Sequence, residues 1–478
     1  MSTDSREAVG PSGWRRRPEY LAILLIAIVY VALIGRYRAF DLDDVWFLSF
    51  SHSFWVQHIP SDTFMHQPFP EGMGGVVAFG KLAAIIQGIV LNALGWSLAS
   101  GIVLTIAFAT GSLILIAMMC RQLGYSSHFT TCYMVLLGLS EPFVAAAEKT
   151  RFEFLALFFL SLALWLASRK SVALAMFVAA MATEVEPVAI VIPFAVMATI
   201  LIQNRGTRTI RWLLPRIAFG AACATVVYFL LHPHIIEVAR SARWGAVSDR
   251  AFPGGFAVAY FVHYKRHLPD LLLLLAAIGV SLALPSRRHL LTQWPAVGIL
   301  TICIVSALLR WGNIPYFCFL SPFFCLFIMQ ALYGERYWKG IVAVILLMML
   351  PQYAYRGYYW STRPADLSQQ DQRRVSEAID RASALIGKPS EQVNLIGNFT
   401  LMFAHPSHFT NLDARIMTPA MIQDSDLILC FDKPLDPILA ADINFEVACP
   451  RLDNTSRMLE TMALDGHELQ IRAPTIHR

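Results

Sequence analysis

Three carboxylates stand close together near the start of the chain, in the stretch Asp41-Leu42-Asp43-Asp44. They follow the first apolar segment, residues 20–35, by only a few residues. Ionisable side chains at a membrane boundary are costly, so they indicate a functional site by default. Such a carboxylate can act as a general base if it reaches a reacting hydroxyl and has a suitable pKa. The alternative is that the acids are solvated loop charges beyond a helix end.

The composition is that of a multi-span membrane protein. Of 478 residues, 56% are hydrophobic and only 15% are charged. Many apolar runs exceed the roughly 17 residues that cross the hydrocarbon core. The net charge of +5 is small for this length, and it indicates basic loops on one side of a membrane rather than nucleic-acid binding. Residues 1–13 contain no apolar run, so residues 20–35 are expected to be a retained first helix.

The apolar segments predict eleven spans, with the N-terminus inside and the C-terminus outside. Arg15-Arg16-Arg17 precedes the first segment, which places the N-terminus in the cytoplasm. The stretch 74–94 is rich in glycine, and counting it as a span would invert every later loop. We therefore expect it to lie at the membrane interface. The predicted spans are residues 20–35, 97–119, 129–147, 152–167, 171–183, 188–202, 212–231, 268–284, 295–309, 314–331 and 341–355.

The chain divides into a cytoplasmic tail (1–19), an all-α membrane domain (20–356) and a small extracytoplasmic α/β domain (361–478). The membrane domain has two long outer loops, residues 37–96 and 232–267. In the C-terminal domain, the periodicity of residues 367–386 predicts an amphipathic helix. Residues 393–396 and 427–431 read as short strands.

The cysteines give no metal-binding or redox motif. Of the eight, six lie in or beside apolar spans, and no C-x-x-C or His/Cys spacing appears. Cys430 and Cys449 fall in the polar C-terminal region. They can form a disulfide if that region is outside the cytoplasm, but spacing alone does not establish the geometry.

The second outer loop, 232–267, is net basic on the side where the positive-inside rule disfavours basic residues. An anionic partner would account for this, and a lipid phosphate fits because the fork of an arginine matches phosphate oxygens. Anchoring in lipid headgroups is the equal alternative. Arg310 and Tyr316 are a further candidate pair, for which anchoring of a helix end is the alternative.

A carboxylate facing a basic and aromatic loop suits the transfer of a sugar from a lipid phosphate. The carboxylate would deprotonate an incoming hydroxyl, and positive charge would stabilise the leaving phosphate. The candidate catalytic residues are Asp43, Asp44 and Asp41. The candidate substrate-binding residues are His66, Glu71, Arg151, Arg243, Lys265, Arg266, Arg310 and Tyr316.

Five motifs occur in a characteristic order: Asp43-Asp44 after the first span, His66-Gln-Pro-Phe-Pro, Arg121-Gln-Leu-Gly124, Lys149-Thr-Arg-Phe-Glu153 and the segment 310–322. Their order resembles the C-type (GT-C) glycosyltransferases, in the branch of protein O-mannosyltransferases, lipid A aminoarabinose transferases and bacterial lipopolysaccharide glycosyltransferases. The resemblance covers most of residues 15–356. Each motif is weak alone, and the evidence is their order.

The resemblance implies hexosyl or pentosyl transfer from a polyprenyl-phosphate donor to a glycan, lipid or protein acceptor. The reaction would take place in the cell envelope, on the outer face of a bacterial inner membrane. Asp43 would be the base, supported by Asp44 or Asp41. Relatives with monophosphate donors generally need no metal, so none is expected, although Asp-x-Asp can bind Mg²⁺ or Mn²⁺.

The chain departs from the family pattern in two places. It lacks the arginine that often begins the second span, and Glu184-Val-Glu186 stands where many relatives carry Thr-Lys. Because of both departures, the sequence does not identify the residues that would bind the phosphate.

Two other functions are alternatives to sugar transfer. A transporter or flippase of lipid-linked saccharides usually shows paired repeats, and none is seen here. A polysaccharide polymerase would not need the acidic stretch after the first span.

Overall fold

The fold is taken from a computed structural model of the chain. The structure describes residues 17–34, 47–48, 50–52, 54–55, 80–147, 150–206, 208–233, 235, 255–262, 268–310, 314–362, 369–397, 409–411, 423–432, 449–452, 455–464 and 467–475.

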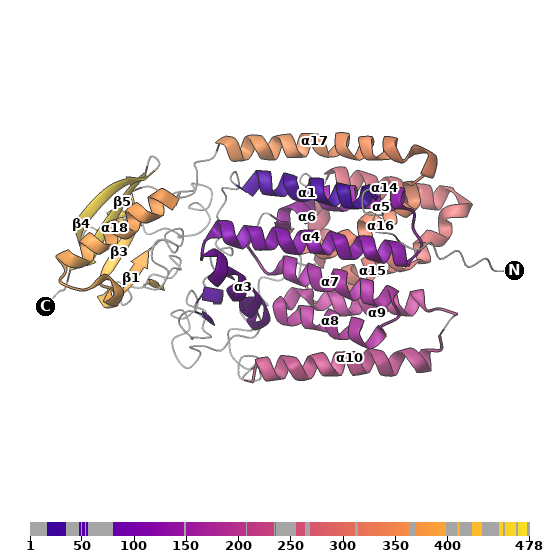
Figure 1. The fold of residues 1–478 in the computed structure, drawn as a ribbon, viewed down its shortest axis with the longest axis horizontal. Helices are drawn as coiled ribbons and strands as arrows, with labels where there is room; N and C mark the ends of the chain where they lie inside the picture. The colour runs from indigo at the N-terminus through magenta and orange to yellow at the C-terminus, as the bar shows by residue number, and fades with distance from the viewer. Residues whose placement is uncertain are drawn as a thin grey trace.

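The described helices between residues 18 and 362 form a bundle, and its long helices run nearly parallel in Figure 1. Most of these helices are apolar on all sides, as expected for helices that contact protein on one side and lipid on the other. The helices are α1 (Pro18–Ile34), α3 (Lys81–Leu94), α4 (Leu98–Gln122), α5 (Ser127–Leu139), α6 (Glu141–Ala147), α7 (Glu153–Ser168), α8 (Val172–Val185), η3 (Pro187–Ile190), α9 (Val191–Gln203), α10 (Ile210–Leu231), α13 (Gly255–Val262), α14 (Leu268–Ala283), η4 (Pro285–Thr292), α15 (Trp294–Leu308), η5 (Ile314–Phe319), α16 (Ser321–Leu332), η6 (Glu335–Tyr337) and α17 (Trp338–Thr362).

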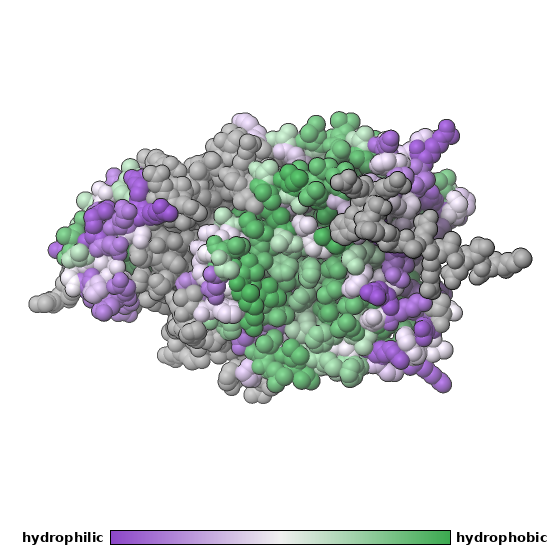
Figure 2. Space-filling model, viewed as in Figure 1, coloured by the Kyte–Doolittle hydropathy of each residue, from purple (hydrophilic) through white to green (hydrophobic). Residues whose placement is uncertain are grey.

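Every predicted span coincides with a helix, but the count of eleven crossings is not confirmed. Within the described residues, two helices are long and apolar enough to cross a membrane, and up to four are if each bent pair counts as one span. Seven further apolar helices have only 10–17 residues. Figure 2 shows a broad apolar band across the visible face of the bundle, with polar residues toward its ends. That band has the appearance of a surface that faces lipid.

The predicted span 129–147 is a broken helix. α5 ends at Leu139, and α6 starts at Glu141 with a bend of 59°. The buried carboxylate of Asp270, from α14, accepts a hydrogen bond at 3.1 Å from the backbone N–H of Glu141. A backbone N–H that a break leaves unpaired is costly in an apolar interior, so Asp270 stabilises the bend.

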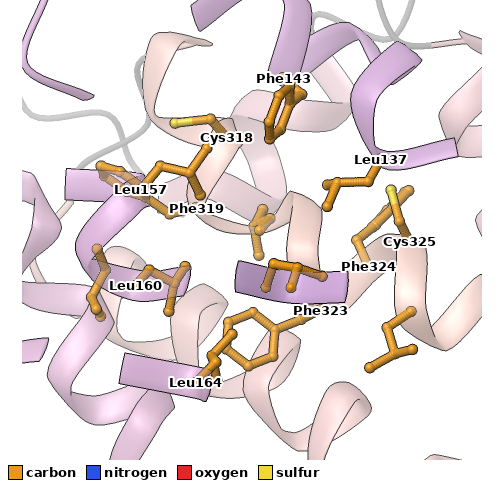
Figure 3. Packing of buried hydrophobic residues seen from close by; sticks show 14 of the residues in the cluster. Leu137, Phe143, Leu157, Leu160, Leu164, Cys318, Phe319, Phe323, Phe324 and Cys325 are labelled. Atoms are coloured by element: carbon orange, nitrogen blue, oxygen red, sulfur yellow. The ribbon is translucent and has the colours of Figure 1, made fainter. Parts of the chain in front are cut away.

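The centre of the bundle is built on aromatic side chains of η5 and α16. Figure 3 shows Phe319, Phe323 and Phe324 among apolar side chains of α5, α6 and α7. Phe323 is fully buried, and it lies so close to Gly298 of α15 that a Cβ there would come within 2.3 Å of its ring. Glycine is therefore required at this contact between α15 and α16.

The helix α3 differs from the long helices in direction. In Figure 1 it lies across one end of the bundle, on the side of the C-terminal sheet, which we call the sheet end. The opposite end is where α1 starts and α4 finishes. This arrangement agrees with the expectation that residues 74–94 do not form a span. The described helix begins at Lys81, so residues 74–79 lie outside the described part.

A small α/β unit follows α17. It contains α18 (Gln369–Leu385), η7 (Ser390–Gln392), β1 (Leu395–Gly397), β2 (Phe409–Asn411), β3 (Leu427–Phe431), η10 (Cys449–Leu452), β4 (Ser456–Leu464) and β5 (His467–Pro474). The strand order is β2-β1-β3-β5-β4, with β1 parallel to β2 and β3, and β5 antiparallel to β3 and β4. The expected small α/β unit is therefore present.

Both faces of this sheet are covered, because alternate residues of a strand point to opposite faces. Leu427 and Leu429 of β3 lie in one apolar cluster with Val375 and Ile379 of α18. Ile428 and Cys430 belong to a second cluster, with Cys449 and Leu452 of η10. The amphipathic helix predicted at 367–386 therefore covers one face of the sheet. The strand predicted at 427–431 is the middle strand of that sheet.

A disulfide joins Cys430 to Cys449, with 5.3 Å between their Cα atoms. The sequence left this pairing open, and the structure makes it. The bond ties β3 to η10, so it closes the second apolar cluster. Disulfides persist in oxidising compartments, which fits an extracytoplasmic position for the α/β unit.

We expect removal of this bond, in a Cys430→Ser/Cys449→Ser variant, to lower the melting temperature of the α/β unit. The bond closes a sequence separation of 19 residues, and a loop of that size contributes about 3 kcal/mol. Thermal melting and limited proteolysis of the purified protein measure the effect. Cys223→Ser is the control, because Cys223 is a free thiol. Equal melting curves for the double variant and the wild type would contradict the assigned role.

Candidate functional site

Most of the predicted site residues lie outside the described part of the chain. These are Asp41, Asp43, Asp44, His66, Glu71, Arg243, Lys265 and Arg266. Three predicted residues are described, namely Arg151, Arg310 and Tyr316. The structure brings Arg151 and Tyr316 together at the sheet end, whereas Arg310 is exposed and no described contact joins it to them.

Arg151 is a buried cation just before α7, with 7% of its surface exposed. Its Nε lies 2.6 Å from Oε1 of Glu153, in the first turn of α7, and its Nη2 donates to the Tyr316 hydroxyl at 3.3 Å. The Tyr316 hydroxyl in turn donates to Oε1 of Glu186 at 3.5 Å. A buried charge is tolerated only with partners such as these. We call Arg151, Glu153, Glu186 and Tyr316 the Arg151 cluster.

The Arg151 cluster joins three separate parts of the chain. Arg151 and Glu153 belong to the start of α7, Glu186 precedes η3, and Tyr316 lies in η5. The predicted motifs at 149–153 and 310–322 therefore meet in space. Glu186, from one of the two departures from the family pattern, sits beside them.

The segment that follows the acidic stretch also contacts Arg151. The Arg151 guanidinium lies 5.7 Å from the ring centroid of Phe47 and 5.7 Å from that of Tyr316. The Phe47 ring also packs against Phe152, with 4.4 Å between centroids. Contacts between a guanidinium and an aromatic face within about 6 Å are attractive. The first outer loop therefore meets the Arg151 cluster at Phe47.

A second group of polar contacts fixes α3 against the bundle. The carboxylate of Glu184, which is fully buried, accepts from the backbone N–H of Leu82 at 3.2 Å. It also lies 2.9 Å from Nε2 of His232, at the end of α10. Lys81 donates to the Leu231 carbonyl at 2.6 Å. An acid at a helix N-terminus satisfies N–H groups that lack partners in the helix, so Glu184 anchors the start of α3.

The pKa of Lys81 is lowered by burial, and the Glu184 carboxylate partly opposes that shift. A lysine at position 184 could not accept the hydrogen bond from the backbone N–H of Leu82.

The side chain of Gln87 connects α3 to the segment around Phe47 and to the start of α7. Its Oε1 accepts from the Ser51 hydroxyl at 2.6 Å, and its Nε2 donates to the Thr150 carbonyl at 3.2 Å. Ser51 belongs to the segment that contains Phe47, and Thr150 directly precedes Arg151. One amide therefore holds the first outer loop, α3 and the start of α7 in a fixed relation.

His52 lies near these groups but is not a source of positive charge. Its ring packs edge-on against Trp96, with 4.9 Å between centroids. Burial lowers the pKa of His52 to about 4, so its imidazole is neutral near pH 7.

The described part of the site is rich in acids. Glu153, Glu184 and Glu186 are buried there, against the permanent cation of Arg151 and the ammonium of Lys81. Such a site can position a hydroxyl or polarise a bound group, but an anionic ligand would need further cations. In the described part of the chain, no group of three His, Cys, Asp or Glu side chains is arranged to hold a metal ion.

The sequence singled out Glu153, Glu184 and Glu186 only as members of two short motifs and gave them no roles. It did not identify Gln87 as a connecting residue or Glu184 as the anchor of α3. A polar residue inside an apolar stretch was the signal for Gln87. The sequence holds no signal for the pairing of Glu184 with His232, because 48 residues separate them.

Comparisons with known proteins agree on the fold. No protein-family model matches the sequence, and no curated protein matches it. The structure is similar to that of ArnT from Cupriavidus metallidurans bound to undecaprenyl phosphate, with a TM-score of 0.53 and 12% identity over 97% of this chain and 98% of that chain. The apo state of the same protein gives the same TM-score. The apo oligosaccharyltransferase of Archaeoglobus fulgidus follows, with a TM-score of 0.50 and 11% identity over 87% of this chain and 70% of that chain. The expected GT-C fold is thereby confirmed.

We expect Glu184→Ala to loosen α3 and to destabilise the protein by about 1–3 kcal/mol, because it removes the acceptor of the Leu82 N–H and the buried partner of the His232 ring. Thermal unfolding of the purified protein measures this, and Glu184→Gln should lose less. The matched control is Glu460→Ala, since Glu460 pairs with Arg381, whose side chain is 59% exposed, and exposed pairs contribute up to about 1 kcal/mol. Equal losses in Glu184→Ala and Glu460→Ala would argue against an anchoring role.

Proposed function

We propose that this protein is an integral membrane glycosyltransferase that moves a sugar from a polyprenyl-phosphate donor to an acceptor on the outer face of the membrane. The observation that carries the proposal is the buried Arg151 cluster, which the GT-C fold holds at the sheet end. The fold adds support, because one neighbour with this fold, ArnT, was crystallised with undecaprenyl phosphate.

Chain length brings the acidic stretch within reach of the Arg151 cluster. Asp44 is three residues before Phe47, whose ring packs beside the Arg151 guanidinium. Three residues span at most about 11 Å when fully extended. Asp43 and Asp44 are therefore joined by a short tether to a residue of the site. We propose that their carboxylates and the Arg151 cluster form one active site.

In this site, Asp43 acts as the general base, supported by Asp44 or Asp41. Asp43 takes the proton from the acceptor hydroxyl as the hydroxyl oxygen attacks the anomeric carbon of the sugar. The bond between that carbon and the phosphate oxygen breaks, and polyprenyl phosphate leaves with the bonding electrons. The step needs no oxidant or co-reactant, and the proposal includes no metal.

The leaving phosphate needs positive charge, and Arg151 alone does not supply enough. Glu153 and Glu186 offset its charge in the described cluster. We propose that basic residues of the second outer loop, Arg243, Lys265 and Arg266, complete the phosphate site. Arg310 is exposed at the end of α15, where it can contact the same phosphate or a headgroup. His66 and Glu71 are proposed to bind the sugar or the acceptor.

Within the cluster, Glu153 and Tyr316 orient the guanidinium. Glu153 engages Nε and Tyr316 accepts from Nη2, so the plane of the fork is set from two sides. A fixed fork presents parallel N–H groups to phosphate oxygens. Charge that is fixed in place before the reaction stabilises the leaving group without reorganisation.

We further propose eleven spans across a bacterial inner membrane, with the N-terminus in the cytoplasm and the α/β unit in the periplasm. The membrane domain, residues 20–356, would carry the chemistry. The C-terminal domain, 361–478, would lie on the side of the acceptor. The Cys430–Cys449 disulfide supports this orientation, because the periplasm is oxidising.

We expect Asp43→Asn to reduce sugar transfer by about 100- to 10,000-fold, because the amide cannot accept the proton of the acceptor. Asp44→Asn should reduce it less. The measurement is transfer from a radiolabelled polyprenyl-phosphate sugar in membranes that contain each variant, with and without EDTA. Asp424→Asn is the matched control, an exposed aspartate of the α/β unit.

Full activity of Asp43→Asn would move the base to another residue. If no donor supported transfer and the same membranes moved intact lipid-linked sugar across the bilayer, the protein would be a transporter instead. Loss of transfer in EDTA would add a metal requirement that the proposal lacks.

A further inference from the structure

A polar cavity lies at the opposite end of the bundle from the Arg151 cluster. It has a volume of about 430 Å³ and lies among the start of α5, η4, the end of α16 and η6. Its polar lining includes Tyr125, Arg287, Gln330, Tyr333 and Glu335. The helix α4 separates the two regions, and its 25 residues span about 37 Å. The cavity is therefore no part of the proposed active site.

Arg287 contributes the positive charge of this cavity. Its Nη1 donates to the Gln330 carbonyl at 2.6 Å, which holds the half-buried guanidinium at the cavity wall. A guanidinium carries five N–H donors in a fixed fork. The donors beyond Nη1 suit the oxygens of a phosphate group.

Gln330 contributes an acceptor that the described residues do not satisfy. The residue is 8% exposed, and its Nε2 donates to the Tyr125 hydroxyl at 2.5 Å. Its Oε1 is buried and has no hydrogen-bond partner in the described part of the chain. A buried acceptor without a partner is costly, so a donor from a bound molecule would stabilise it.

Glu335 contributes a negative charge to the same cavity. Its carboxylate accepts from Ser126 at 2.9 Å and from the Tyr333 hydroxyl, and it lies 2.9 Å from Nδ1 of His128. These hydrogen bonds lower the pKa of Glu335, so it is ionised near pH 7. A carboxylate has about four acceptor sites, and three described contacts leave one for a ligand.

The two charges favour a zwitterion over a simple anion. A phosphate facing Arg287 would be repelled by Glu335 unless the ligand also carried a cation. A primary ammonium has three N–H donors, which match the Glu335 carboxylate and the Gln330 acceptor. A quaternary ammonium has no N–H donor and cannot satisfy them. Aromatic faces of Tyr125, Phe129 and Tyr333 line the same space and attract a cation.

Exposed apolar residues lie close in sequence to Arg287 and Leu290, which line the cavity. Leu282 is in α14, Leu284 stands between α14 and η4, and Leu291 is in η4, so the three flank the sharp bend of 120° between the two helices. Their side chains are 54%, 47% and 36% exposed. They can contact acyl chains while Arg287, in the same η4, faces the headgroup. Exposed leucines near a cationic headgroup site favour a lipid over a soluble phosphate–amine compound as the ligand.

We propose that this cavity binds one phospholipid with a phosphate–primary amine headgroup, of the phosphatidylethanolamine class. Arg287 holds the phosphate, Glu335 and the Gln330 side chain hold the ammonium, and η4 contacts the acyl chains. The site is independent of sugar transfer, because no residue of the cavity belongs to the Arg151 cluster.

The test measures lipid retained by the purified, delipidated full chain, using native mass spectrometry. The probes are dioleoyl phosphatidylethanolamine, phosphatidylcholine and phosphatidylglycerol. We expect one phosphatidylethanolamine per chain, retained about tenfold more than the other two lipids. Arg287→Gln and Glu335→Gln should each reduce that retention about tenfold. Arg288→Gln is the matched control, since Arg288 is the exposed neighbour in η4 and its Nε donates to the Leu282 carbonyl.

Three outcomes would overturn the proposal. If phosphatidylcholine were retained as well as phosphatidylethanolamine, the N–H donors of the headgroup would have no role in binding. If Arg287→Gln and Glu335→Gln both retained as much phosphatidylethanolamine as the wild type, the lipid would bind elsewhere. Competition by glycerophosphoethanolamine at the affinity of the intact lipid would make the ligand a soluble phosphate–amine compound. Melting curves of each variant separate loss of the site from loss of the fold, and Glu335→Gln alters an exposed side chain.

Discussion

The structure depends on one constraint, which is that charges buried beside hydrocarbon must have partners. Glu184 satisfies this constraint because its carboxylate accepts a hydrogen bond from a backbone N–H at the start of α3 and pairs with His232. Glu19 meets it at the opposite end, where its fully buried carboxylate accepts from Arg121 and Ser127. Each contact joins helices that are distant in sequence. The pairs therefore determine which helices meet, while the apolar side chains supply most of the burial.

The same constraint links the anchoring of α3 to the chemistry of the site. Because Glu184 and Gln87 hold α3 across the end of the bundle, the segment at Phe47 packs beside Arg151. A transferase needs its base, its donor phosphate and its acceptor within a few ångströms of one another. In this chain the short helix α3, which lies across the sheet end of the bundle, connects the parts that would carry these groups.

The apolar segments predicted the helices because a membrane allows few other structures. The break at Ser140 escaped prediction, since Asp270 stabilises it from a distant helix. The hairpin of β4 and β5 was missed, although Asp465-Gly466 stands between two strand-like runs and such pairs favour tight turns. The order of motifs brought Arg151 and Tyr316 into one candidate site. Partners such as Glu184 and His232 are fixed by packing, which sequence periodicity does not encode.

We propose that the acidic stretch and the Arg151 cluster form one site for a lipid phosphate. An experimental structure with polyprenyl phosphate bound is the sharpest test of that proposal. We expect the phosphate at the sheet end, within hydrogen-bond distance of Arg151 or of a basic residue of the loop 232–267, with the Asp43 carboxylate facing the same space. Polyprenyl phosphate bound beside Arg121, at the opposite end of the bundle and away from the sheet end, would contradict this assignment.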